Sequence, residues 1–144
     1  MDKALELAQD AARAGEVPVG CVIVKDDHVV ASSRNEVEAR SDVRAHAEML
    51  AIERASEALS NKYLAGCTLY VTLEPCPMCA GALVWTKIDR VVFGAMDPKA
   101  GACGTLFNVI SSPQLNHRVE LVHGVREQES EKLLKEFFRD KRGT

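Results

Sequence analysis

The stretch LEPCPMCAG at Leu73–Gly81 places two cysteines three residues apart, with a proline on each side of the first. The apolar run CTLYVTL that leads into it predicts a buried strand. Pro77 suits the first position of a helix, where its missing N–H costs no hydrogen bond. Cys76 and Cys79 then share one side of the first helical turn, whose amino end favours thiolates. The stretch therefore predicts a strand, a tight turn and a helix whose first turn places two sulfurs where one ion can reach both.

Outward from this stretch, helices alternate with strands along the whole chain. Apolar residues at helical spacing predict helices over residues 2–14, 45–59, 77–86 and 127–144. Apolar runs bounded by turn residues predict a β-hairpin over 20–35, turning at Asp26 and Asp27, and strands over 67–73, 90–94 and 117–124. We therefore expect an α/β fold: a three-layer α/β/α sandwich with a mixed five-stranded sheet, mixed because the chain opens with a hairpin.

Composition limits the class of protein. With 144 residues and 47% hydrophobic residues, the chain fits one domain over 1–144 whose core needs no disulfide bonds. It has no apolar run near the roughly 20 residues that span a bilayer, and its amino terminus is unlike a signal peptide. We therefore expect a cytoplasmic protein with no membrane partner. The net charge of −3 gives no global attraction to nucleic acid, although a local basic patch remains compatible with it.

The cysteine pair has three possible roles: a zinc site, a redox pair or core packing. A redox pair is expected after the first strand of a thioredoxin-like pattern, whereas this pair follows three strands and two helices. Zinc requires further ligands, and His46 opens the predicted helix at 45–59, with Glu48 two residues later. The combination His46-x-Glu48 followed by Pro75-Cys76-x-x-Cys79 is the signature of zinc-dependent nucleobase deaminases.

The residue types explain the chemistry. Two thiolates and one imidazole leave the fourth zinc position open for water, as a catalytic site requires. A carboxylate such as Glu48 beside that position can take a proton from water and deliver it to a ring nitrogen and a leaving amine. Residues two apart on a helix do not share a face, so we expect the zinc to lie off the end of this helix. The alternative is a structural zinc closed by Cys103, from the glycine-rich loop predicted at 94–104, but it leaves Glu48 without a role.

Five stretches together resemble the bacterial tRNA-specific adenosine deaminases of the TadA type, within the cytidine/deoxycytidylate deaminase superfamily. They are GEVPVGCVIV, AHAEMLAIERA, GCTLYVTLEPCPMCAGAL, RVVFGAMDPKAGACGTL and LNHRVE, and the resemblance covers nearly the whole chain. It implies a cytidine-deaminase-like fold and one Zn²⁺ per subunit. It also implies a homodimer that hydrolytically converts adenosine to inosine at the wobble position, 34, of a tRNA anticodon stem-loop.

The resemblance also implies roles for individual residues. His46, Cys76 and Cys79 would bind zinc, and Glu48 would transfer protons. Residues implied in substrate binding are Asn35 at the flipped nucleoside, Val17, Pro18 and Val19 as an apolar wall, Asp97 at the ribose, and Asn116 and Phe138 at the anticodon loop. The aromatic ring of Phe138 would stack on a base, and the basic residues that follow it, Arg139, Lys141 and Arg142, would meet phosphates.

Two rival functions stay open at this point. One is a deaminase of a free nucleobase or nucleoside, of the guanine or cytosine type, with the same zinc and glutamate. The other is a non-catalytic RNA-binding subunit that keeps zinc for stability, and the presence of Glu48 argues against it. The chain also departs from the family pattern at Val43 and Arg44, where Pro-Thr is common, and at Cys21 and Cys103, where small residues are common.

Overall fold

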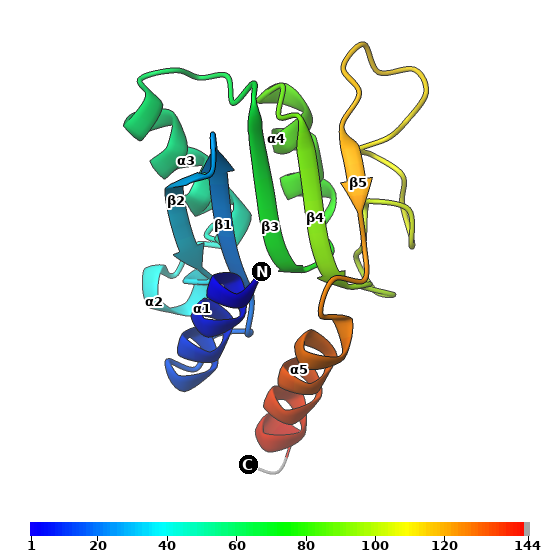
Figure 1. The fold of residues 1–144 in the computed structure, drawn as a ribbon. Coiled ribbons are helices and arrows are strands. Elements are labelled where there is room, and N and C mark those ends of the chain that lie inside the picture. Colours follow the sequence, from blue (N-terminus) through cyan, green and yellow to red (C-terminus); the bar gives the residue numbers. More distant parts are fainter. Residues whose placement is uncertain (143–144) are drawn as a thin grey trace.

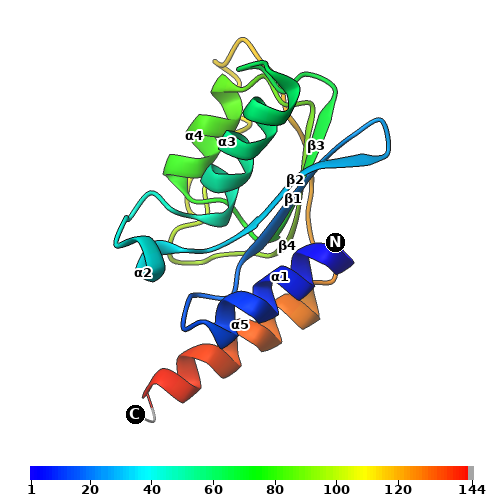
Figure 2. The same ribbon diagram turned by 90° about the vertical axis from the view of Figure 1, so that its left-hand side faces the viewer.

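A computed structural model describes residues 1–142 as a sheet between two layers of helices. The elements along the chain are α1 (Asp2–Arg13), β1 (Gly20–Lys25), β2 (His28–Arg34), α2 (Val37–Arg40), α3 (Ala47–Leu59), β3 (Cys67–Leu73), α4 (Pro77–Trp85), β4 (Arg90–Ala95), β5 (Glu120–Val122) and α5 (Glu127–Arg142). Figure 1 shows the five strands side by side, in the order β2-β1-β3-β4-β5. Figure 2 shows α3 and α4 on one side of this sheet and α1 and α5 on the other. The predicted three-layer sandwich is confirmed.

The sheet is mixed, as predicted. β1 pairs antiparallel with β2 and with β3, whereas β3, β4 and β5 run parallel. The hairpin turn falls at Asp26 and Asp27, whose φ angles of 50° and 62° are both left-handed. Two consecutive left-handed residues match a two-residue hairpin turn whose twist suits the flanking strands. The hairpin explains why the sheet begins with an antiparallel pair.

The core lies between the sheet and its two helix layers. Ile23, Leu69, Val71 and Val91 are fully buried in the three central strands. Gly20 lets α1 approach the sheet directly, because a Cβ there would stand only 1.9 Å from the carbonyl oxygen of Ala4. The α1 helix therefore packs on β1 by backbone contact, which fixes the segment between them against the carboxyl end of β3.

Within the described residues, two elements differ from the sequence prediction by at least two residues at an end. The second long helix begins at Ala47 rather than residue 45, because His46 has an extended backbone and acts as its N-cap. The strand predicted over 117–124 shortens to β5, since the ring Nε2 of His117 lies 2.6 Å from the carbonyl oxygen of Ile88 and backbone pairing starts only at Glu120. The last two residues of the helix predicted over 127–144 lie outside the described residues.

The short helix α2 was not predicted. Its amino end is held by the buried carboxylate of Glu16, which accepts hydrogen bonds from the backbone N–H groups of Glu38 and Ala39 at 2.9 and 2.8 Å. This contact joins residues 22 and 23 positions apart, so local sequence pattern does not reveal it.

The parallel pair β3 and β4, connected by α4, brings two strand ends to one edge of the sheet. In open α/β sheets, ligands bind in the crevice outside the carboxyl ends of the strands.

Within residues 1–142, no helix has both the length and the apolar character needed to cross a bilayer.

Candidate active site

The three predicted ligands come together at the amino ends of two helices. His46 is the N-cap of α3, and Cys76 is the N-cap of α4, with Cys79 one turn into that helix. The Nδ1 atom of His46 lies 3.5 Å from the Sγ atom of each cysteine. All three potential ligand atoms lie within 4.8 Å of one another. One small ion at the centre of this triangle can reach all three.

The chemistry of this cluster fits a zinc ion. Hydrogen bonds from Cys79 and from His46 lower the pKa of the Cys76 thiol to about 4, so a thiolate is present at neutral pH. Cys79 keeps its proton when no cation is bound, because donating to Cys76 raises its pKa. A divalent cation takes the place of that proton. Two sulfurs with one imidazole form a ligand set of catalytic zinc.

Cys103 does not join this cluster. Among the described residues, the group whose ligand atoms meet comprises only His46, Cys76 and Cys79. Cys103 is buried elsewhere, and burial raises the pKa of its thiol well above the usual range. This arrangement favours a site with three protein ligands over a structural site closed by a fourth.

Glu48 lies beside the ligands in a cavity of about 210 Å³. Its side chain is 4% exposed, and this burial raises the pKa of its carboxyl group to about 7 when no cation is present. A bound cation nearby lowers that value again, because it stabilises the carboxylate. His46 and Cys76 line the same cavity, so the carboxyl group shares one small space with two of the three ligands.

The walls of the cavity come from strand ends and loops. The apolar walls include Val17, Val19 and Leu73. Asn35 also lines the cavity, and its Oδ1 accepts the backbone N–H of Ala47 at 3.2 Å. This bond fixes the side-chain amide at the amino end of α3, which leaves its NH₂ group as a donor. The cavity thus combines an apolar wall with one oriented amide, which is the usual composition of a small-molecule site.

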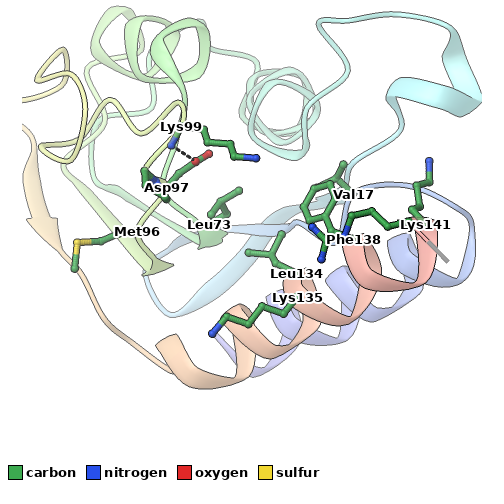
Figure 3. Close-up of a pocket in the computed structure, with 11 residues that line it drawn as sticks. Val17, Leu73, Met96, Asp97, Lys99, Leu134, Lys135, Phe138 and Lys141 are labelled. Atoms are coloured by element: carbon green, nitrogen blue, oxygen red, sulfur yellow. Dashed lines mark hydrogen bonds between the residues drawn. The ribbon is translucent and has the colours of Figure 1, made fainter.

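Asp97, which follows the end of β4, also lines the cavity. Its Oδ1 accepts the backbone N–H groups of Lys99 and Ala100 at 2.9 and 3.2 Å, which closes a turn at the end of β4. Figure 3 shows the bond to Lys99 and places Asp97 on the same side of the pocket as Leu73. Asp97 borders both the small cavity and a larger groove beside it.

The larger groove has a volume of about 650 Å³ and runs from the small cavity to α5. The two hollows share Val17, Leu73 and Asp97 as walls. On its far side, α5 contributes Leu134 and Phe138, and Figure 3 shows the ring of Phe138 next to Val17. Phe138 is 44% exposed, an unusual position for a phenylalanine. Basic residues from two elements line the groove as well: Lys99, Lys135, Lys141 and Arg142.

Known proteins share this combination of fold and site. A family model of MafB19-like deaminases matches residues 1–142. A tRNA-specific adenosine deaminase of Bacillus subtilis (strain 168) is 48% identical over 142 residues, which cover 99% of this chain and 88% of the relative. The chain belongs to the tRNA-specific adenosine deaminase family.

Solved structures agree with this membership. A structure from work on A-to-I editing by tRNA:A34 deaminases superimposes with a TM-score of 0.89 at 43% identity, covering 93% of this chain and 97% of that one. A guanine deaminase from Bacillus subtilis superimposes with a TM-score of 0.66 at 39% identity, covering 72% of this chain and 67% of that one. The cytidine-deaminase-like fold that the resemblance implied is thereby confirmed.

Asn116 stands apart from the residues that meet at the cavity. It is exposed in the long connection between β4 and β5. Its neighbour His117 contacts Ile88, which precedes the amino end of β4, whereas Asp97 follows the carboxyl end of that strand. Within this chain, the structure therefore does not bring Asn116 to the pocket.

One buried site residue was missed by the sequence analysis. Glu74 is 2% exposed and lines the small cavity, between the end of β3 and the ligand Cys76. Its carboxylate accepts hydrogen bonds from the segment that begins with Asp97. The signal available in the sequence was a lone acidic residue directly after a buried strand, because such a residue must find donors inside the protein.

Proposed function

We propose that this chain is a single zinc-dependent deaminase domain, residues 1–144, that hydrolyses adenosine to inosine and ammonia at wobble position 34 of a tRNA anticodon. The observation that carries this proposal is the pairing of a small ligand-lined cavity with a large basic groove. The cavity suits one flipped base, and the groove offers an aromatic ring and cations to neighbouring nucleotides. The tRNA-specific relatives support the same substrate class.

The residues of the chain divide the chemistry among them. His46, Cys76 and Cys79 would hold Zn²⁺, which when bound supplies an activated water at neutral pH. Glu48 takes a proton from the attacking water and passes it to the ring nitrogen next to the reacting carbon. Glu48 then transfers the second proton of the same water to the exocyclic amine of the base. The amine leaves as ammonia, and the reacting carbon keeps the oxygen of the water. The NH₂ of Asn35 donates to the nucleoside and holds it in the cavity.

The groove provides the RNA contacts in this proposal. Phe138 stacks on a base that flanks the reacting nucleotide, and Asp97 contacts the ribose beside it. Arg139, Lys141 and Arg142 belong to the same end of α5 and meet phosphates there. Asn116 lies at the other end of β4, so its contact belongs to a more distant part of the stem-loop or comes from the other subunit of a homodimer.

A homodimer is supported by the outer surface of α4. The helix PMCAGALVW carries no charged residue, yet Met78, Ala82 and Trp85 are wholly or partly exposed along one of its sides. An exposed apolar strip of this kind marks an interface. All five cysteines are free thiols, which suits the reducing cytoplasm as the proposed location.

The test uses the purified, zinc-assayed protein with an anticodon stem-loop that carries adenosine at position 34. Free adenosine, cytidine and guanine are assayed in parallel, and inosine and ammonia are measured. We expect inosine from the stem-loop alone. Ammonia from guanine alone would replace the tRNA substrate by a free base and leave the metal site in place.

A further inference from the structure

We propose that Glu74 is a positioning residue for this reaction, because its buried carboxylate fixes Asp97 and the pocket wall relative to the metal-binding turn. This inference rests on the proposed function, since it assigns a substrate-positioning role to one wall of the same site. Glu74 itself does not touch the reacting atoms in this scheme. It acts through the segment 97–105 that it holds.

The carboxylate of Glu74 accepts hydrogen bonds from both ends of this segment. Oε1 accepts the backbone N–H of Asp97 at 3.1 Å and the hydroxyl of Thr105. Oε2 accepts the backbone N–H groups of Cys103 and Thr105 at 2.9 and 3.2 Å. Four donors therefore converge on one buried carboxyl group, so its oxygens are satisfied by hydrogen bonds inside the protein.

Backbone bonds add to the same connection. The N–H of Glu74 donates to the carbonyl of Ala95 at 2.9 Å, and its carboxylate accepts the N–H of Asp97. Glu74 is therefore hydrogen-bonded to the residues on both sides of Met96. The N–H of Ala102 donates to the carbonyl of Pro75 at 2.9 Å. Residues 74 and 75 lead directly into the ligand Cys76, so the segment and the metal site share one rigid support.

Gly101 shows that the segment is shaped around this carboxylate. A Cβ at Gly101 would stand 2.5 Å from the carboxyl carbon of Glu74 and 2.6 Å from the carbonyl oxygen of Asp97. Any larger residue would push the carboxylate or the turn away. Gly101 and Glu74 thus form one close contact. Substitution of either residue should disturb this contact and allow Asp97 to move from its position beside the cavity.

This support matters because the connection from β4 to β5 is long and has little regular structure. Within it, the structure places only an isolated bridge between Cys103 and Asn108. A displacement of about 1 Å at a substrate-positioning group can cost about 100-fold in catalytic efficiency, kcat/KM. Without Glu74, three backbone N–H groups lose their acceptor, and Asp97 loses its fixed place beside the cavity.

The test compares wild type with Glu74→Gln, Gly101→Ala and the milder Thr105→Val, which removes one of the four donors. Zinc content, amide hydrogen exchange over residues 97–105, and kcat and KM are measured, using the substrate that the wild type deaminates. We expect unchanged zinc, faster exchange at these amides, and KM raised about tenfold or more with a smaller loss of kcat. Thr105→Val should show a weaker effect of the same kind and covers the case in which the other variants fold poorly.

The control is Leu64→Ala, a truncation of a fully buried side chain before the amino end of β3, away from the site. It destabilises the fold without touching the segment, so KM should stay at the wild-type value. The inference fails if the Glu74 and Gly101 variants keep the wild-type KM, or if the control raises KM equally. Failure of the proposed function is seen separately, as absence of inosine from the stem-loop with the wild-type protein.

Discussion

At the scale of single residues, Glu48 is an ionisable carboxyl group that is almost fully buried. Burying a carboxylate costs several kcal/mol unless partners compensate for the lost hydration. The amino end of α3 supplies part of that compensation, because its N–H groups favour a negative charge in the first turn. A bound cation would supply the rest. In the proposed function, the burial of Glu48 therefore serves catalysis rather than stability.

We predict that Glu48→Ala loses turnover by about 10²- to 10⁴-fold, because proton transfer is removed. Zinc content should stay unchanged, since the ligands remain, and the free energy of unfolding should not fall, since a buried charge is lost. Steady-state kinetics with metal analysis and thermal unfolding checks this. Glu53→Ala, on the exposed side of the same helix, is the control and should remain active. Retained activity in Glu48→Ala would disprove the proton-transfer role.

Phe138 allows a second test at this scale, because its neighbour provides a matched control. Phe138 faces the groove, whereas Phe137 lines a shallow hollow against Ala12 and Gly15 of the amino-terminal segment. Stacking on a base is worth about 1–3 kcal/mol, so Phe138→Ala should weaken stem-loop binding by about 5- to 150-fold. Phe137→Ala should lower thermal stability and leave RNA affinity near wild type. Equal RNA affinities for wild type and Phe138→Ala, measured by fluorescence anisotropy, would remove the stacking role.

At the scale of elements, the β1–β2 hairpin carries strain in its turn. Asp26 and Asp27 both have left-handed backbone angles, which glycine adopts without steric cost. We predict that Asp27→Gly raises the free energy of unfolding by up to about 1 kcal/mol, because relief of strain outweighs the added freedom of the unfolded chain. Asp27→Val should lower it, since a β-branched residue resists this conformation. Thermal unfolding of both variants and of wild type tests this prediction. A melting temperature of Asp27→Gly below that of wild type would contradict it.

Most elements followed from local pattern. The apolar strand at Cys67–Leu73, Pro77 at the start of α4 and the turn at Asp26 and Asp27 are encoded within a few neighbouring residues, and all were found where predicted. The helix α2 and the short extent of β5 were not predictable in this way. The first depends on the distant carboxylate of Glu16, and the second on a side-chain contact of His117.

The same distinction applies to the site. Residue type and spacing signalled His46, Cys76, Cys79 and Glu48 as a group, and the structure brings these four residues together. Glu74 takes its role from donors 23 to 31 positions away, and no spacing rule reveals such a partner. The position of Asn116 away from the pocket also depends on the path of an irregular connection, which pattern and propensity do not determine.

At the scale of the whole molecule, the ligand cluster joins the amino ends of two helices that lie on one face of the sheet. Because the unfolded chain does not hold His46 near Cys76 and Cys79, the free energy of metal binding adds to the free energy of folding. We predict that Cys79→Ala purifies with little zinc and melts at a lower temperature than wild type. A chelator should lower the melting temperature of wild type and leave that of Cys79→Ala unchanged. Full zinc occupancy in the variant would exclude Cys79 as a ligand.

The outer face of α4 determines how subunits associate in our proposal. Trp85 is 80% exposed at the end of this uncharged helix. A partner that covers this large aromatic ring removes its apolar surface from water, which favours association. Trp85→Arg places a charge in the proposed interface and should convert the dimer to a monomer, measured by light scattering across a concentration series. Val29→Arg, at a half-exposed site on the β1–β2 hairpin, is the control and should remain dimeric.

Zinc content and RNA affinity of the monomer show whether the dimer is needed for the metal site or for RNA binding. The three ligands and Glu48 lie within one chain, so Trp85→Arg should keep its zinc. If Asn116 reaches the RNA from the other subunit, the monomer should bind the stem-loop more weakly, and Asn116→Ala should produce a similar loss while remaining dimeric. If the Trp85→Arg protein stays dimeric, the interface does not include the outer face of α4. A monomer with wild-type affinity would confine all RNA contacts to one chain.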